Sequence, residues 1–64
     1  MKEKTSQRLS RGALLANLKE VVSKLENGAL KIGEKTIVLP ESAVFTLEWK
    51  EEISKRKLEI EIEW

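Results

Sequence analysis

The seven residues from Leu58 to Trp64 alternate apolar and acidic side chains without a break. Successive side chains of a β-strand point to opposite faces, so one face here carries Leu, Ile, Ile and Trp and the other carries three Glu. A helix would spread both sets around its circumference. The pattern therefore predicts a half-buried strand over residues 56–64.

A helix is predicted earlier in the chain. Ser10 is suited to cap its N-terminus, because a serine hydroxyl accepts a hydrogen bond from an unpaired backbone N–H of the first turn. Asn27-Gly28 is suited to end it, because glycine readily takes the left-handed conformation that follows a helix. We expect this helix over residues 11–27. Its apolar stripe at helical spacing consists of Leu14, Leu15, Leu18, Val21, Val22 and Leu25.

Beyond Gly28 the spacing of apolar residues changes from 3.6 to 2, which predicts three further strands. We expect them over residues 29–32, 35–39 and 43–50. Gly33-Glu34 has the composition of a two-residue hairpin turn, and Pro40 ends the second of these strands because it cannot donate a backbone hydrogen bond.

The pairing of the last two strands depends on their charges. One register sets Leu47 opposite Leu58, Phe45 opposite Ile60, and Glu48 opposite Lys57. A shift by two residues keeps the same faces but sets Glu48 opposite Glu59, which is unfavourable across strands. We therefore expect the first register.

Together these elements predict an α+β fold in a single domain over residues 1–64. One amphipathic helix would pack on one face of an antiparallel β-meander of about four strands, with a short N-terminal edge strand as an open addition. Residues 1–9 fit either that edge strand or a polar tail, and the alternation of Thr5, Gln7 and Leu9 slightly favours the strand. The face that the helix would cover consists of Leu30, Ile32, Ile37, Leu39, Phe45, Leu47, Trp49, Leu58, Ile60, Ile62 and Trp64.

The size and composition limit what such a domain can do. A chain of 64 residues is near the lower limit for independent folding, and the absence of cysteine leaves only good packing or oligomerisation to stabilise it.

The net charge is +1, but residues 1–32 carry +4 and residues 33–64 carry −3. We see no signal peptide and no apolar run of about 18 residues, so we expect a cytoplasmic protein with no membrane partner.

The side-chain inventory is unfavourable for catalysis. Histidine, cysteine, aspartate and tyrosine are all absent, and the serines and glycines form no catalytic or nucleotide-binding motif. We therefore expect no enzyme, no catalytic residues and no cofactor. The row Glu59, Glu61 and Glu63 could attract a divalent cation, but a flat row lacks the converging oxygens of a metal site. We expect a solvated face there and no metal.

Two interaction surfaces remain as candidates. The first comprises Trp49, Ile62 and Trp64, which would lie at the ends of the apolar face beside an open strand edge, where a protein partner or a second copy could dock. The second comprises Lys4, Arg8 and Arg11, which could contact phosphates of a nucleic acid. We favour protein–protein interaction or self-association, with nucleic-acid binding through the basic N-terminal half as the alternative.

The order of these features resembles the amphi-Trp domain family of small bacterial and archaeal proteins. The resemblance rests on Leu9-Ser10-Arg11 before an Ala/Leu-rich helix, Leu25-Glu26-Asn27-Gly28 after it, the Leu39-Pro40-Glu41 turn, and the closing alternation. It covers essentially the whole chain. The helix start departs from it, because Arg11-Gly12-Ala13 is less acidic than is usual in the family. The resemblance implies a stand-alone module of unknown function and provides no catalytic residues.

Overall fold

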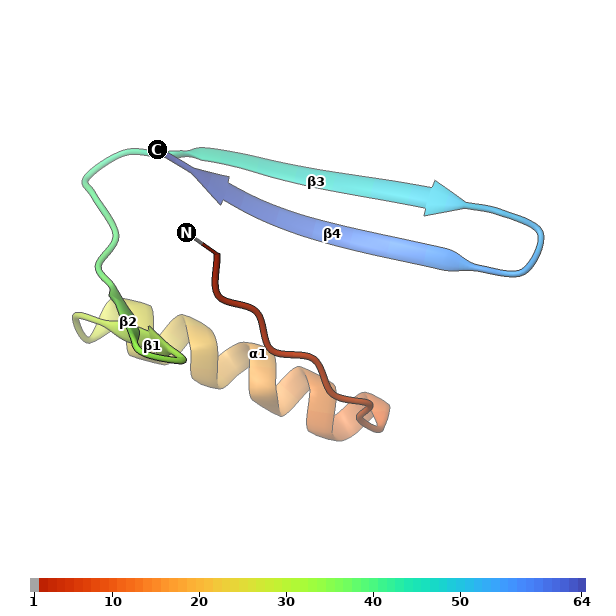
Figure 1. Ribbon diagram of the computed structural model, residues 1–64, viewed down its shortest axis with the longest axis horizontal. Helices are drawn as coiled ribbons and strands as arrows, with labels where there is room; N and C mark the ends of the chain where they lie inside the picture. Colours follow the sequence, from red (N-terminus) through yellow and green to blue (C-terminus); the bar gives the residue numbers. More distant parts are fainter. Residues whose placement is uncertain (1) are drawn as a thin grey trace.

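A computed structural model describes residues 2–64 of the protein. Over this range it contains one helix and four strands (Figure 1), in agreement with the predicted α+β class. The predicted bounds are correct to within two residues at each end. The elements are α1 (Arg11–Glu26), β1 (Leu30–Ile32), β2 (Lys35–Ile37), β3 (Val44–Glu51) and β4 (Arg56–Glu63).

Local hydrogen bonds define both ends of α1. At the start, the Ser10 hydroxyl accepts a hydrogen bond of 3.3 Å from the Ala13 N–H, which confirms the predicted cap. At the end, the Asn27 N–H donates to the Ser23 carbonyl at 3.0 Å and the chain leaves through Gly28 at φ 127°. The helix boundaries are therefore encoded in the capping residues.

The four strands pair as two separate antiparallel hairpins. β1 pairs with β2 through the two-residue turn Gly33-Glu34, in which Gly33 has φ 59°. β3 pairs with β4 over eight residue pairs, and β2 is not paired with β3. The strands follow one another as in a meander, but within residues 2–64 no single four-stranded sheet forms.

The register of the β3–β4 hairpin differs from the expected one. Leu47 lies opposite Ile60 and Glu48 lies opposite Glu59, so the predicted pairing of Glu48 with Lys57 is wrong by two residues. The expected register would have required a two-residue turn at Glu52-Ile53, and such turns favour residues with positive φ. A β-branched residue such as Ile53 resists positive φ.

The observed register instead closes the hairpin with a loop over residues 52–55. The Glu52 N–H donates to the Lys55 carbonyl at 2.8 Å, and no non-glycine residue in the described chain has positive φ. The geometry of the turn therefore determines the register, although it places Glu48 opposite Glu59.

Residues 2–9 form neither helix nor strand, so the edge strand slightly favoured from the alternation is wrong for them. Met1 lies outside the described residues. Thr5 is the only β-branched residue in this segment, so little in its composition favours strand pairing. The segment reaches the first hairpin, because a Cβ added at Gly33 would lie 2.7 Å from Oε2 of Glu3.

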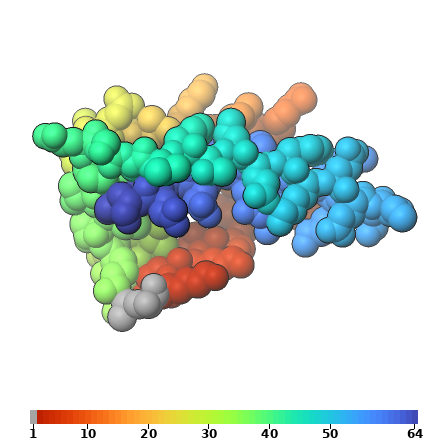
Figure 2. All heavy atoms as spheres, turned by 90° about the horizontal axis from the view of Figure 1, so that it is seen from above, coloured from red at the N-terminus to blue at the C-terminus, as the bar shows by residue number. Residues whose placement is uncertain are grey.

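Packing in the molecule is open. None of the described residues is fully buried, and the least exposed apolar side chains belong to Leu9, to α1 and to the first hairpin. The closest approach between layers is that of α1 to β1. The β3–β4 hairpin lies apart from them, and its turn end projects beyond the rest of the molecule (Figures 1 and 2). The half-buried apolar residues are Leu9, Val21, Leu25, Leu30, Ile32 and Ile37.

Candidate interaction surface

Six large apolar side chains share one face of the β3–β4 hairpin. Because the strands alternate and pair in register, these residues form three directly opposed cross-strand pairs. Their exposed fractions range from 41% at Ile62 to 63% at Leu58. We call this surface the hairpin face. Its pairs are Phe45 with Ile62, Leu47 with Ile60, and Trp49 with Leu58.

The hairpin face is as open to solvent as the charged face behind it. The side chains of the charged face are 35–58% exposed at its two ion pairs, and the residues of the hairpin face are 41–63% exposed. The alternation predicted the reverse, with the apolar side covered by the helix. Full burial of such a side chain is worth about 1.5–3 kcal/mol, and each of the six, being 41–63% exposed, forfeits about half of that.

The apolar stripe of α1 is uncovered in the same way. Leu14, Leu15, Leu18 and Val22 are 42–54% exposed, and only Val21 and Leu25 are half-buried, near the first hairpin. We call these six residues the helix stripe. Two apolar surfaces of one molecule are therefore both incompletely packed.

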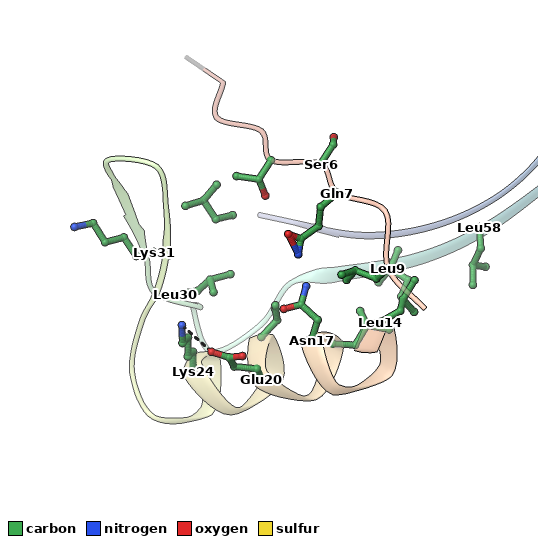
Figure 3. Close-up of a pocket in the computed structure, with 15 residues that line it drawn as sticks. Ser6, Gln7, Leu9, Leu14, Asn17, Glu20, Lys24, Leu30, Lys31 and Leu58 are labelled. Carbon is green, nitrogen blue, oxygen red and sulfur yellow. Dashed lines mark ion pairs between the residues drawn. The ribbon is translucent and has the colours of Figure 1, made fainter. Parts of the chain in front are cut away.

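A groove of about 920 Å³ lies between α1 and β4 (Figure 3). Leu58 and Ile60 line it from the hairpin face, and Leu14 and Leu18 line it from the helix stripe. The chain segment that contains Gln7 and Leu9 runs along it. The hairpin face therefore points towards the helix, but the space between them is open.

Polar groups also reach this groove. In Figure 3 the amides of Gln7 and Asn17 point towards each other across it. Glu20 and Lys24 form an ion pair of 3.2 Å on the wall of α1. In the described chain no buried side-chain nitrogen or oxygen lacks a partner. The groove is thus a mainly apolar surface with solvated polar groups at its rim.

The charged face of the hairpin is organised by ion pairs within each strand. Lys50 Nζ lies 3.2 Å from Glu48 Oε1, and Lys57 Nζ lies 2.9 Å from Glu59 Oε1. The hydrogen bond and charge of Lys57 lower the pKa of Glu59, and the hydrogen bond and charge of Glu48 raise the pKa of Lys50. These pairs hold charge on the outer face, away from the hairpin face.

The three residues predicted for protein interaction lie along one hairpin. Trp49 and Ile62 belong to the hairpin face, and Trp64 follows the end of β4 with 64% of its surface exposed. Trp49 is opposite Leu58, six residues before Trp64 in an extended chain, so the two tryptophans mark opposite ends about 20 Å apart. The sequence pattern had not pointed to the groove residue Asn17, and it had placed Gln7 only in the weak alternation of the N-terminal segment.

The predicted phosphate contacts are exposed and spread over two segments. Lys4 and Arg8 lie in the irregular segment before α1, and Arg11 is the first residue of the helix. The first turn of α1 carries no acidic residue.

A second basic surface, which the sequence reasoning missed, lies at the turn end of the β3–β4 hairpin. Lys50 and Lys57 are directly opposite each other there and line a hollow of about 140 Å³ together with Lys55 and Glu52. Only the register reveals it, because the sequence does not show which lysines face each other. Lys50 and Lys57 are already paired with glutamates, so binding of an anion in this hollow is less favourable.

Two further kinds of site are absent from residues 2–64. No group of three or more acidic side chains is placed to hold a metal ion, so Glu59, Glu61 and Glu63 do not converge. No helix there is long and apolar enough to cross a membrane.

Comparison with protein-family models, with curated proteins and with solved structures finds no match to this chain. The resemblance to the amphi-Trp domain family therefore stays a prediction.

Proposed function

We propose that this protein is a non-enzymatic interaction module that binds a protein, either another chain or a second copy of itself, through the hairpin face. The observation that carries the proposal is the set of three opposed apolar pairs that remain 41–63% exposed. Large apolar patches on soluble proteins are typical of interaction sites. Aromatic residues such as Phe45 and Trp49 are enriched in the centres of protein interfaces.

Matched substitutions on the two faces of β3 test this function. Leu47 belongs to the hairpin face, whereas its neighbour Thr46 belongs to the charged face. Leu47→Lys and Thr46→Lys add the same charge on opposite sides of the strand. Tagged versions of both variants and of the unchanged protein would be used for affinity capture from an extract of the native cells.

We expect a protein that is captured by the unchanged chain and by Thr46→Lys but lost with Leu47→Lys. Far-UV circular dichroism would check that both variants keep their secondary structure. Equal capture by the two variants would show that the hairpin face is not the binding surface. Capture of nothing by the unchanged chain, together with a purified protein that sediments as a monomer, would also contradict the proposal.

Nucleic-acid binding is the second candidate, and one observation favours it. Lys4, Arg8 and Arg11 are exposed, and the positive end of the α1 dipole at Arg11 has no acidic side chain in its first turn. A labelled single-stranded oligonucleotide at low salt would test it, with Arg8→Gln and Arg11→Gln as variants. Binding that is absent at about 50 mM salt would exclude this function, since phosphate contacts are strongest at low salt.

A further inference from the structure

The accessible surface of the chain is far larger than its mass predicts. A compact monomer of 7.3 kDa exposes about 4,200 Å². This chain exposes 6311 Å², so about 2,100 Å² is in excess. Its radius of gyration is 13.5 Å, whereas a compact chain of this length has about 10.7 Å. A large part of its surface is therefore available for a partner.

We infer that the partner which covers this surface is a second copy of the chain, with the hairpin face of each copy packed on the helix stripe of the other. This rests on the proposed function and names its partner. If each copy buries its excess, the interface totals about 4,200 Å², which falls within the range of obligate homodimers. A partner with an interface of standard size would cover only about 800 Å² on each side and would leave most of the excess exposed.

One chain contains both halves of such an interface. The hairpin face and the helix stripe are both apolar, and neither is covered within the chain. A twofold axis would satisfy both at once, since each contact between the hairpin of one copy and the helix of the other then occurs twice. The charges agree with this pairing, because residues 1–32 carry +4 and residues 33–64 carry −3.

The hairpin has an obstacle to closing on its own helix. Thr5, Ser6, Gln7 and Leu9 line the groove between α1 and β4. Movement of the hairpin onto its own helix stripe would have to displace this segment, together with the contact of Glu3 near Gly33. A two-stranded hairpin is also marginally stable by itself in water. Covering it by a second copy stabilises the hairpin without closing it onto its own helix.

Sedimentation measures the first consequence. We expect a species of twice the 7.3 kDa chain mass that dissociates on dilution, and we expect Leu47→Lys to raise its dissociation constant at least about tenfold while Thr46→Lys does not. A protein that stays monomeric up to about 1 mM would overturn the inference. The proposed function would still be decided separately, by the capture of another protein with the same two variants.

Disulfide trapping tests the arrangement with conservative variants, because the chain has no cysteine of its own. Leu18→Cys on the helix stripe would be mixed with Leu47→Cys on the hairpin face and oxidised gently. A disulfide requires Cα atoms within about 7 Å, so a mixed disulfide reports direct contact between copies. The control mixture replaces Leu47→Cys by Thr46→Cys.

We expect the mixed disulfide of Leu18→Cys with Leu47→Cys to exceed that of the control mixture several-fold. Equal yields from the two mixtures would overturn the reciprocal packing. It would also be overturned if disulfides formed only between two Leu47→Cys chains, that is, between two hairpins.

Discussion

Glu48 and Glu59 lie directly opposite each other across the β3–β4 hairpin, and each is paired with a lysine on its own strand. Lys50 neutralises Glu48 at 3.2 Å and Lys57 neutralises Glu59 at 2.9 Å. Two like charges can therefore face each other at modest cost, because residues two apart on a strand share a face. The hairpin turn sets the register, and the two lysines reduce the repulsion between Glu48 and Glu59.

The first prediction concerns the pH dependence of Glu59. Its pKa is lowered from 4.5 in the folded chain, mainly by the hydrogen bond and charge of Lys57. A carboxyl with a lowered folded pKa stabilises the fold above its unfolded pKa, and this contribution is lost as the pH falls through the folded value. Lys57→Met should therefore bring the pKa of Glu59 closer to 4.5, measured by NMR titration of its side-chain carbon.

The same variant has a consequence for unfolding. At pH 7 Lys57→Met should unfold at a lower urea concentration than the unchanged protein, and the difference should shrink below pH 4.5 as Glu59 is protonated in both. Lys55→Met, in the hairpin loop, is the control and should leave the pKa of Glu59 as low as in the unchanged protein. An unchanged Glu59 titration in Lys57→Met would show that the 2.9 Å ion pair is not formed in solution.

The second prediction tests the register itself. Glu48→Gln removes one of the two opposed charges but keeps an oxygen that can accept from Lys50. Loss of the repulsion with Glu59 and loss of the exposed ion pair with Lys50 are each worth about 0.2–1 kcal/mol. The two effects oppose each other, so this variant should stay within a few tenths of a kcal/mol of the unchanged protein. In the register expected from the sequence, Glu48 would face Lys57 and the same substitution would destabilise.

Urea unfolding at fixed protein concentration distinguishes these two outcomes. Glu61→Gln is the matched control, because Glu61 faces the uncharged Thr46 and should also change stability little. A loss of stability in Glu48→Gln relative to this control would contradict the observed register.

Local signals in the sequence were sufficient for the elements and their ends. Ser10 and Gly28 define α1 because caps act within a few residues, and Gly33 defines the first turn for the same reason. The register of β3 and β4 was missed because the requirement of the loop at Ile53 outweighed the charge at Glu48. Sequence patterns show which residues share a face, whereas turn geometry decides which residues are opposite.

The candidate interaction surface could be predicted only in part. The alternation correctly places Trp49 and Ile62 on one face of the hairpin. It could not reveal that this face stays exposed, because burial depends on whether α1 and the hairpin meet in space. The segment that contains Thr5, Gln7 and Leu9 lines the groove and decides that relationship, and its weak alternation favoured an edge strand over this path.

The third prediction contrasts two glycines. Gly33 has φ 59° and lies against the carboxylate of Glu3, whereas Gly12 is helical and has no atom within 4 Å of an added Cβ. Gly33→Ala should cost about 1–2 kcal/mol, because an L-residue is strained at positive φ. Gly12→Ala should instead stabilise by about 0.5–1 kcal/mol.

Unfolding of these two variants under identical conditions gives the comparison. The Glu3 side chain is flexible and can move away from a new methyl group, so Glu3→Ala with Gly33→Ala should recover little of the loss. Full recovery in that double variant would attribute the effect to the contact and not to the turn.

The last prediction concerns the two tryptophans. Trp64 is 64% exposed beyond the end of β4, so Trp64→Ala should lower the free energy of unfolding by less than about 1 kcal/mol. A core tryptophan would cost about 3–5 kcal/mol.

Trp49 lies within the hairpin face opposite Leu58, so Trp49→Ala should mainly weaken self-association, by about 2 kcal/mol or roughly 30-fold. Unfolding must be compared at one protein concentration, because association adds to apparent stability. A loss above about 3 kcal/mol in Trp64→Ala at a concentration where the chain is monomeric would place that ring in a closed core and contradict the open hairpin described here.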